Sequence, residues 1–65
     1  MLVLSKHFSQ DALAVLRELP ADQPLGELPD AKGFFVCRGD RAPEGFAFIE
    51  YLREGELVGV LCQRK

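Results

Sequence analysis

The chain has 65 residues, of which ten are acidic and eight are basic, and its formal net charge is −2. This length suits one small domain, and an apolar fraction of 48% is too high for a disordered chain. The interspersed charges exclude a general polyanion binder, whose affinity depends on a surplus of Lys and Arg. Two cysteines without a CxxC motif or a Cys/His cluster exclude a disulfide framework and a structural zinc site.

The N-terminal half predicts one strand and one helix. Residues 1–5 form a short apolar run of strand length, too short for a signal peptide or a membrane span. Ser9 is placed to cap a helix, since apolar residues then recur at helical spacing as far as Leu19. Pro20 ends that helix. Residues 20–32 are predicted as a crossover loop with at most one 3₁₀ turn near Leu25.

The C-terminal half predicts three strands, at residues 34–38, 46–52 and 57–63, with a tight turn centred on Glu54-Gly55. The expected fold is therefore α+β, in the order β-α-β-β-β. One helix packs on one face of a three-stranded antiparallel meander, and residues 1–65 form a single domain. The position of the first strand in the sheet stays open, because either a parallel or an antiparallel place is possible.

The predicted turn sets the register of the meander. It pairs Arg53 with Glu56 and places Tyr51 opposite Val58, so that the residues of each strand divide between two faces. The face with smaller side chains leaves room for a helix and is expected to be covered. Its residues are Phe35, Cys37, Ala47, Ile49, Tyr51, Val58, Val60 and Cys62.

The opposite face is then uncovered in a monomer, and an exposed apolar patch of that kind marks an interaction surface. Arg38 and Glu50 share this face and could supply polar specificity. The sequence thus predicts a small, cytoplasmic, non-enzymatic binding or regulatory protein without a cofactor, which forms a homodimer or docks another protein. The predicted contact residues are Phe34, Val36, Arg38, Phe46, Phe48, Glu50 and Leu61.

The segment Glu44 to Tyr51 resembles the RNP1 octapeptide of the RNA recognition motif, which has a Gly-aromatic-Gly/Ala-Phe core. The resemblance implies that Phe46 and Phe48 project from the sheet and stack on bases. Glu44 stands where that family has a basic residue. Because of the resemblance, binding of single-stranded RNA through the strand from Phe46 to Tyr51 is the alternative to protein docking.

Other reactive residues carry weaker signals. The predicted register separates Cys37 from Cys62 by a whole strand, or roughly 9–10 Å, so both are expected to be buried free thiols. His7 has Ser5, Ser9 and Asp11 nearby, but all four share one junction, whereas catalytic triads join separate segments. Gly59, inside the last strand, is expected to allow a bulge or a close backbone approach.

Overall fold

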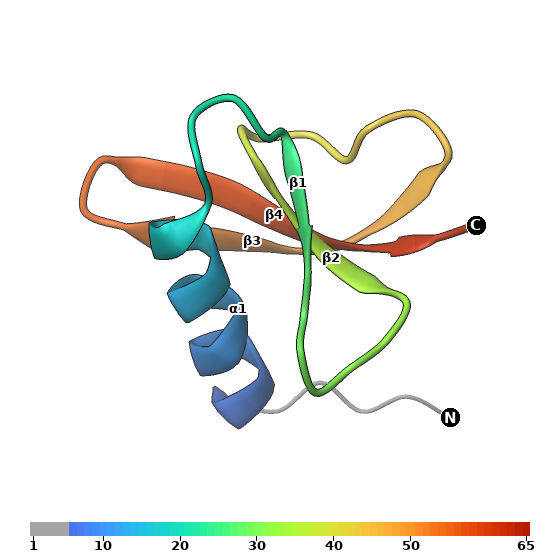
Figure 1. The fold of residues 1–65 in the computed structure, drawn as a ribbon, viewed down its shortest axis with the longest axis horizontal. Coiled ribbons are helices and arrows are strands. Elements are labelled where there is room, and N and C mark those ends of the chain that lie inside the picture. Colours follow the sequence, from blue (N-terminus) through green and yellow to red (C-terminus); the bar gives the residue numbers. More distant parts are fainter. Residues whose placement is uncertain (1–5) are drawn as a thin grey trace.

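The computed structural model describes residues 6–65, with side chains from Ser9 onward. Helix α1 (Lys6–Glu18) is followed by strands β1 (Leu25–Glu27), β2 (Phe34–Arg38), β3 (Phe46–Glu54) and β4 (Leu57–Arg64). Figure 1 shows the strands as one twisted sheet with α1 to one side. The predicted α+β class is confirmed for these residues. The strand predicted at residues 1–5 lies outside the described part of the chain.

Helix α1 begins at Lys6, so the prediction that Ser9 caps the helix is wrong. The Ser9 hydroxyl instead donates a hydrogen bond of 2.5 Å to a carboxylate oxygen of Glu50 on β3. Ser9 therefore lies inside the helix, and its hydroxyl contacts the sheet. The helix ends at Glu18, shortly before Pro20, as the sequence indicated.

All strand pairs are antiparallel and the sheet order is β1-β2-β4-β3. The predicted meander is wrong because β4, and not β3, lies beside β2. The chain also forms β1 where a loop was predicted. Residues 59–62 of β4 are all buried, as befits a central strand, whereas β3 carries Glu50, Arg53 and Glu54 and lies at the edge, where charges stay solvated.

Two local features set the register of the β3–β4 hairpin. Glu54 pairs with Leu57, so the turn is centred on Gly55-Glu56, one residue later than predicted. Gly55 has a φ of +62°, which suits the first central position of a type II′ turn. A β-bulge then interrupts β3 between Phe48 and Glu50. A shift of the turn by one residue changes the cross-strand pairs but not the faces, so Tyr51 still shares a face with Val60, as predicted. The bulge moves Phe46 and Phe48 from the predicted face of Leu61 to the face of Cys62.

The core lies between α1 and the face of the sheet that was predicted to be uncovered. Ala12 and Leu16 of the helix share one buried cluster with Phe34, Val36, Leu52 and Leu61 of the sheet, and with Leu28. The prediction that α1 covers the smaller residues is therefore wrong.

Gly59 makes room for the helix on this face. A Cβ atom at Gly59 would lie 2.7 Å from Leu16 Cδ1 and 2.7 Å from the Cys37 carbonyl oxygen. The predicted close approach at Gly59 is thus confirmed, while the bulge lies elsewhere. Within residues 6–65, no helix is long and apolar enough to cross a membrane.

Candidate partner-binding face

The face of the sheet opposite α1 carries aromatic rings and arginines. In the observed register, Phe35 and Phe48 both lie opposite Cys62 of β4, Phe46 lies opposite Arg64, and Tyr51 lies opposite Val60. Residues directly opposite in a ladder share a face. We call the following set the aromatic face: Phe35, Phe46, Phe48, Tyr51, Arg53 and Arg64.

The bulge brings Phe48 and Tyr51 to the same face. Residues three positions apart in a regular strand point to opposite sides of a sheet. The extra residue, Ile49, reverses the alternation, so Ile49 packs against the core while Tyr51 joins Phe48 outside it. The sequence prediction had Tyr51 on the helix side because it placed α1 on the wrong face of the sheet. It separated Phe46 and Phe48 from Tyr51 because register counting cannot detect a bulge.

The aromatic side chains form two edge-on pairs. The ring centroids of Phe35 and Phe46 are 5.2 Å apart, and the guanidinium carbon of Arg64 lies 5.3 Å and 5.8 Å from them. The rings of Phe48 and Tyr51 are 4.7 Å apart. These distances are in the range of favourable aromatic and cation–π contacts.

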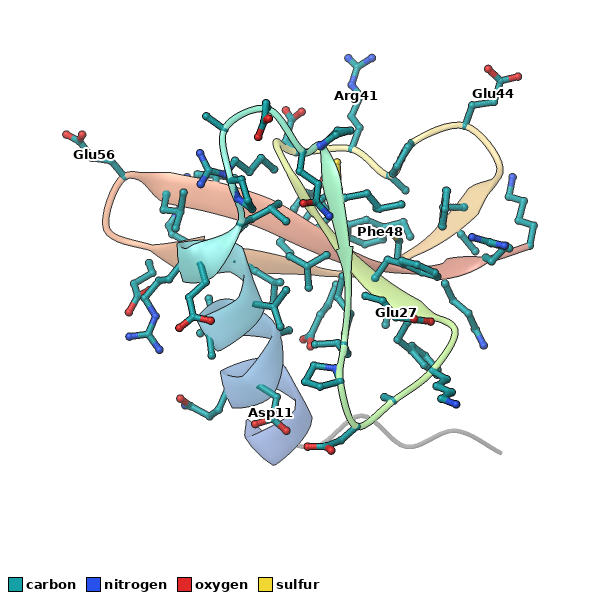
Figure 2. All side chains as sticks on the ribbon, in the orientation of Figure 1. Asp11, Glu27, Arg41, Glu44, Phe48 and Glu56 are labelled. Carbon is teal, nitrogen blue, oxygen red and sulfur yellow. The ribbon has the colours of Figure 1, made fainter. Side chains whose placement is uncertain are left out.

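Among the side chains described from Ser9 onward, Phe48 and Tyr51 are the large apolar ones that are most exposed to solvent. Their exposed fractions are 46% and 66%, while Val60 and Cys62 of β4 are fully buried. Figure 2 labels Phe48 over the sheet, with Arg41 and Glu44 projecting from the β2–β3 loop. The rings of Phe48 and Tyr51 are therefore accessible to a partner, whereas the side chains of β4 beneath them are not.

The charges near these rings are unevenly distributed. Arg53 and Arg64 are both exposed on the face. Glu27 of β1 lies opposite Phe35 on the same face, but its carboxylate accepts the Gly33 backbone N–H at 2.9 Å. The carboxylates of β3 belong to the helix side, where Glu54 pairs with Arg17 at 3.1 Å. The aromatic face thus presents cations in preference to free anions.

Of the seven contact residues predicted from the sequence, Phe46 and Phe48 lie on the aromatic face. Phe34, Val36 and Leu61 are buried in the core beneath α1, so they are not available to a partner.

The two predicted polar contacts lie on the helix side of the sheet. The Arg38 guanidinium donates to the carbonyl of Leu19 at the end of the helix, and Glu50 accepts from Ser9. Both side chains therefore tie α1 to the sheet. The sequence reasoning missed Phe35, Tyr51, Arg53 and Arg64. A type II′ turn has Gly at its first central position, so a turn that places Gly55 there would have predicted the observed β3–β4 pairs.

The cysteines also differ from their predicted arrangement. Cys37 and Cys62 lie on the neighbouring strands β2 and β4, and no strand separates them. Both are free thiols. Burial raises the pKa of each, and the nearby Cys37 raises the pKa of Cys62 further. Among the side chains described, no group of three or more His, Cys, Asp or Glu residues could hold a metal ion.

A shallow hollow of about 330 Å³ adjoins Tyr51 at the turn end of the hairpin. Its lining combines a ring, a cation, an anion and two aliphatic side chains, which are Asp40, Tyr51, Leu52, Arg53 and Val58. Such a lining can receive one side chain of a docked partner.

Comparison of the chain with protein-family models, with curated proteins and with solved structures found no match.

Proposed function

We propose that this chain is a non-enzymatic binding protein that docks another protein through the aromatic face. The observation that carries the proposal is the exposure of Phe48 and Tyr51 beside Arg53 and Arg64. Tyr, Phe and Arg are enriched at the energetically dominant centres of protein interfaces, where Lys and Glu are depleted. The composition of the face matches that of an interface centre.

The dimensions of the protein are compatible with this role. A standard interface takes about 800 Å² from each partner. The accessible surface of the described residues is 4640 Å², so such a contact would cover about one sixth of it. One face of a sheet can supply an area of that size, and α1 occupies the other face.

The charges favour a different protein over a second copy. In a face-to-face dimer, Arg53 and Arg64 of each copy would meet a surface that carries the same two arginines and one carboxylate, that of Glu27. The carboxylate of Glu27 is engaged by Gly33. A partner with acidic groups around an apolar centre would pair these cations, and charge complementarity of this kind sets specificity.

Site-specific photo-crosslinking in the native host tests the proposal. A photoreactive phenylalanine analogue replaces Phe48, and the matched control carries it at Glu18, which is exposed on α1. We expect a crosslinked product with another protein from position 48 only. A product of twice 7.2 kDa would indicate self-association instead. Equal crosslinking from both positions, or none from position 48, would refute docking on this face.

A second candidate function is the binding of single-stranded RNA. It is favoured by the position of Phe46 and Phe48 on the aromatic face, as the RNP1 resemblance implies, and by Arg64, whose guanidinium carbon lies 5.8 Å from the centre of the Phe46 ring. Two arginine–phosphate contacts predict a weak salt dependence, with a slope of about −1.4 for log K against log salt. Replacing Phe48 by Ala should cost about 1–3 kcal/mol of lost stacking. Absence of oligonucleotide binding at low salt would end this candidate.

A further inference from the structure

The outer edge of β3 is a second element of the docking surface. β3 lies at one end of the sheet, and among residues 6–65 no strand pairs with its outer side. The other edge strand, β1, has only 3 residues, whereas β3 has 9. From Glu50 to Glu54 the ladder with β4 is regular, so this part of β3 presents a straight edge.

One hydrogen bond shows which backbone groups of β3 point outward. The Val58 carbonyl accepts the N–H of Gly39 at 2.9 Å, on the β2 side of β4. Val58 is therefore not hydrogen-bonded to Arg53, its partner across the ladder. In an antiparallel pair such residues direct their N–H and C=O groups away from each other. The backbone groups of Arg53, and by alternation those of Tyr51, face the open edge.

The same two residues carry side chains of the aromatic face. A strand added along this edge would lie beside Phe48 and Tyr51 and next to the hollow at Tyr51 and Arg53. Its backbone would satisfy the outward groups, and every second side chain would reach the aromatic face. Edge and face thus form one continuous surface.

The charges of β3 disfavour pairing with a second copy. A two-fold axis at Leu52 is the register that uses the whole regular segment. It places Glu50 of each copy opposite the second copy's Glu54. Like charges directly opposite each other destabilise a ladder. Shifting the register moves the ladder into the bulge or past the turn. Natural edge strands use charges in this way to prevent self-pairing.

We propose that an extended segment of the protein partner adds to β3 as a fifth strand. On the aromatic face this segment carries apolar and acidic side chains, which contact Tyr51 and pair with Arg53. On the helix side it carries basic side chains, which lie opposite Glu50 and Glu54 and share these carboxylates with Ser9 and Arg17. The inference rests on the proposed function, because it names the part of the partner that the surface recognises.

A peptide with this alternation tests the inference. The probe is Val-Lys-Glu-Lys-Val-Lys-Glu-Lys, and the control is Val-Val-Glu-Glu-Lys-Lys-Lys-Lys, which has the same composition without the alternation. Amide shifts and hydrogen exchange of the ¹⁵N-labelled chain report binding. In the free chain, the Tyr51 and Arg53 amides should exchange faster than that of Leu52. The alternating peptide should slow their exchange and bind at least about tenfold more tightly than the control.

Two variants at one position isolate the backbone contribution. Arg53→Ala and Arg53→Pro both lose the guanidinium, but only proline loses the outward N–H. Proline is tolerated where the N–H of an edge strand faces solvent, so both variants should fold, as circular dichroism will verify. We expect the proline variant to bind the alternating peptide about tenfold more weakly than the alanine variant does, which is the equivalent of ~1.4 kcal/mol for one hydrogen bond.

Several results would overturn the inference. Equal binding of the alternating peptide by the two Arg53 variants would refute strand addition at β3. If the crosslink from position 48 persisted, docking on the aromatic face would still stand. Slow exchange at Tyr51 and Arg53 in the free chain would mean that the edge is already occupied. Concentration-dependent protection without peptide would point to a second copy. A response of these amides to an oligothymidylate but not to the alternating peptide would point to nucleic acid.

Discussion

Replacing Gly59 by Ala tests the closest approach between α1 and the sheet. The added Cβ would lie 2.7 Å from both Leu16 Cδ1 and the Cys37 carbonyl oxygen, a distance that real Cβ contacts essentially never show. The leucine can rotate, but the carbonyl belongs to the backbone of β2 and cannot move without straining the sheet. Overpacking of this kind costs about 1–3 kcal/mol. A 65-residue domain has a total stability of roughly 3–10 kcal/mol, so the loss is easily measured.

Gly26→Ala is the matched control. At Gly26 the nearest atoms are Leu19 Cδ1 at 2.8 Å and Val15 Cγ1 at 3.4 Å, and both belong to side chains. The effect of Gly→Ala on the unfolded chain, about 0.4–1 kcal/mol in favour of Ala, is common to both variants and cancels. In urea unfolding followed by circular dichroism, Gly59→Ala should have the lower midpoint of the two. A midpoint for Gly59→Ala equal to or above that of Gly26→Ala would refute the packing argument.

Three further predictions concern single contacts. Ser9→Ala removes the hydrogen bond to Glu50 and should lower the free energy of unfolding in urea by about 1–3 kcal/mol, whereas Ser9→Thr keeps the hydroxyl and should lower it less. Equal losses of unfolding free energy would contradict a stabilising role of that bond. Arg17→Ala breaks an exposed pair with Glu54 and should cost below about 1 kcal/mol, an effect that 1 M salt removes; a larger, salt-independent loss would contradict this. Burial raises the pKa of Cys62 above its ordinary value of 9.0, so the contribution of the protonated thiol to stability is complete below pH 9 and is lost as the pH rises toward the folded-state pKa. Cys62→Ala should therefore reduce the decrease of the urea unfolding midpoint above pH 9. An unchanged decrease would contradict a raised pKa at Cys62.

Local chemistry made the element types largely predictable. The apolar spacing from Ala12 to Leu19 and the proline that follows located the helix, although it begins earlier than the Ser9 cap suggested. β-branched and aromatic residues between glycines located β2, and β3 and β4 each extend by only one or two residues beyond prediction. Such signals are carried by neighbouring residues, so they are present before the chain folds.

The candidate face was less predictable, because it depends on which side of the sheet α1 covers and on the bulge in β3. Phe46 and Phe48 were predicted on the uncovered face and lie there because two errors cancel. The helix packs on the face that was predicted to be open, and the bulge moves these two residues to the opposite face. Tyr51 was assigned to the covered side because α1 was predicted to pack on the face that Tyr51 shares with Val60. Phe34 was assigned to the uncovered side for the same reason, since α1 packs on the face that Phe34 shares with Val36 and Leu61.

The sequence by itself determined the α+β class, the approximate positions of α1, β2, β3 and β4, and the presence of more apolar strand surface than one helix can cover. Only the tertiary structure decided that β4 lies in the centre, that α1 packs over Gly59, and that the outer rings stand beside Arg53 and Arg64. The reason is physical. Element type follows from interactions over a few residues, whereas strand order and register follow from burying the most apolar strand on both faces and leaving charged β3 at the edge.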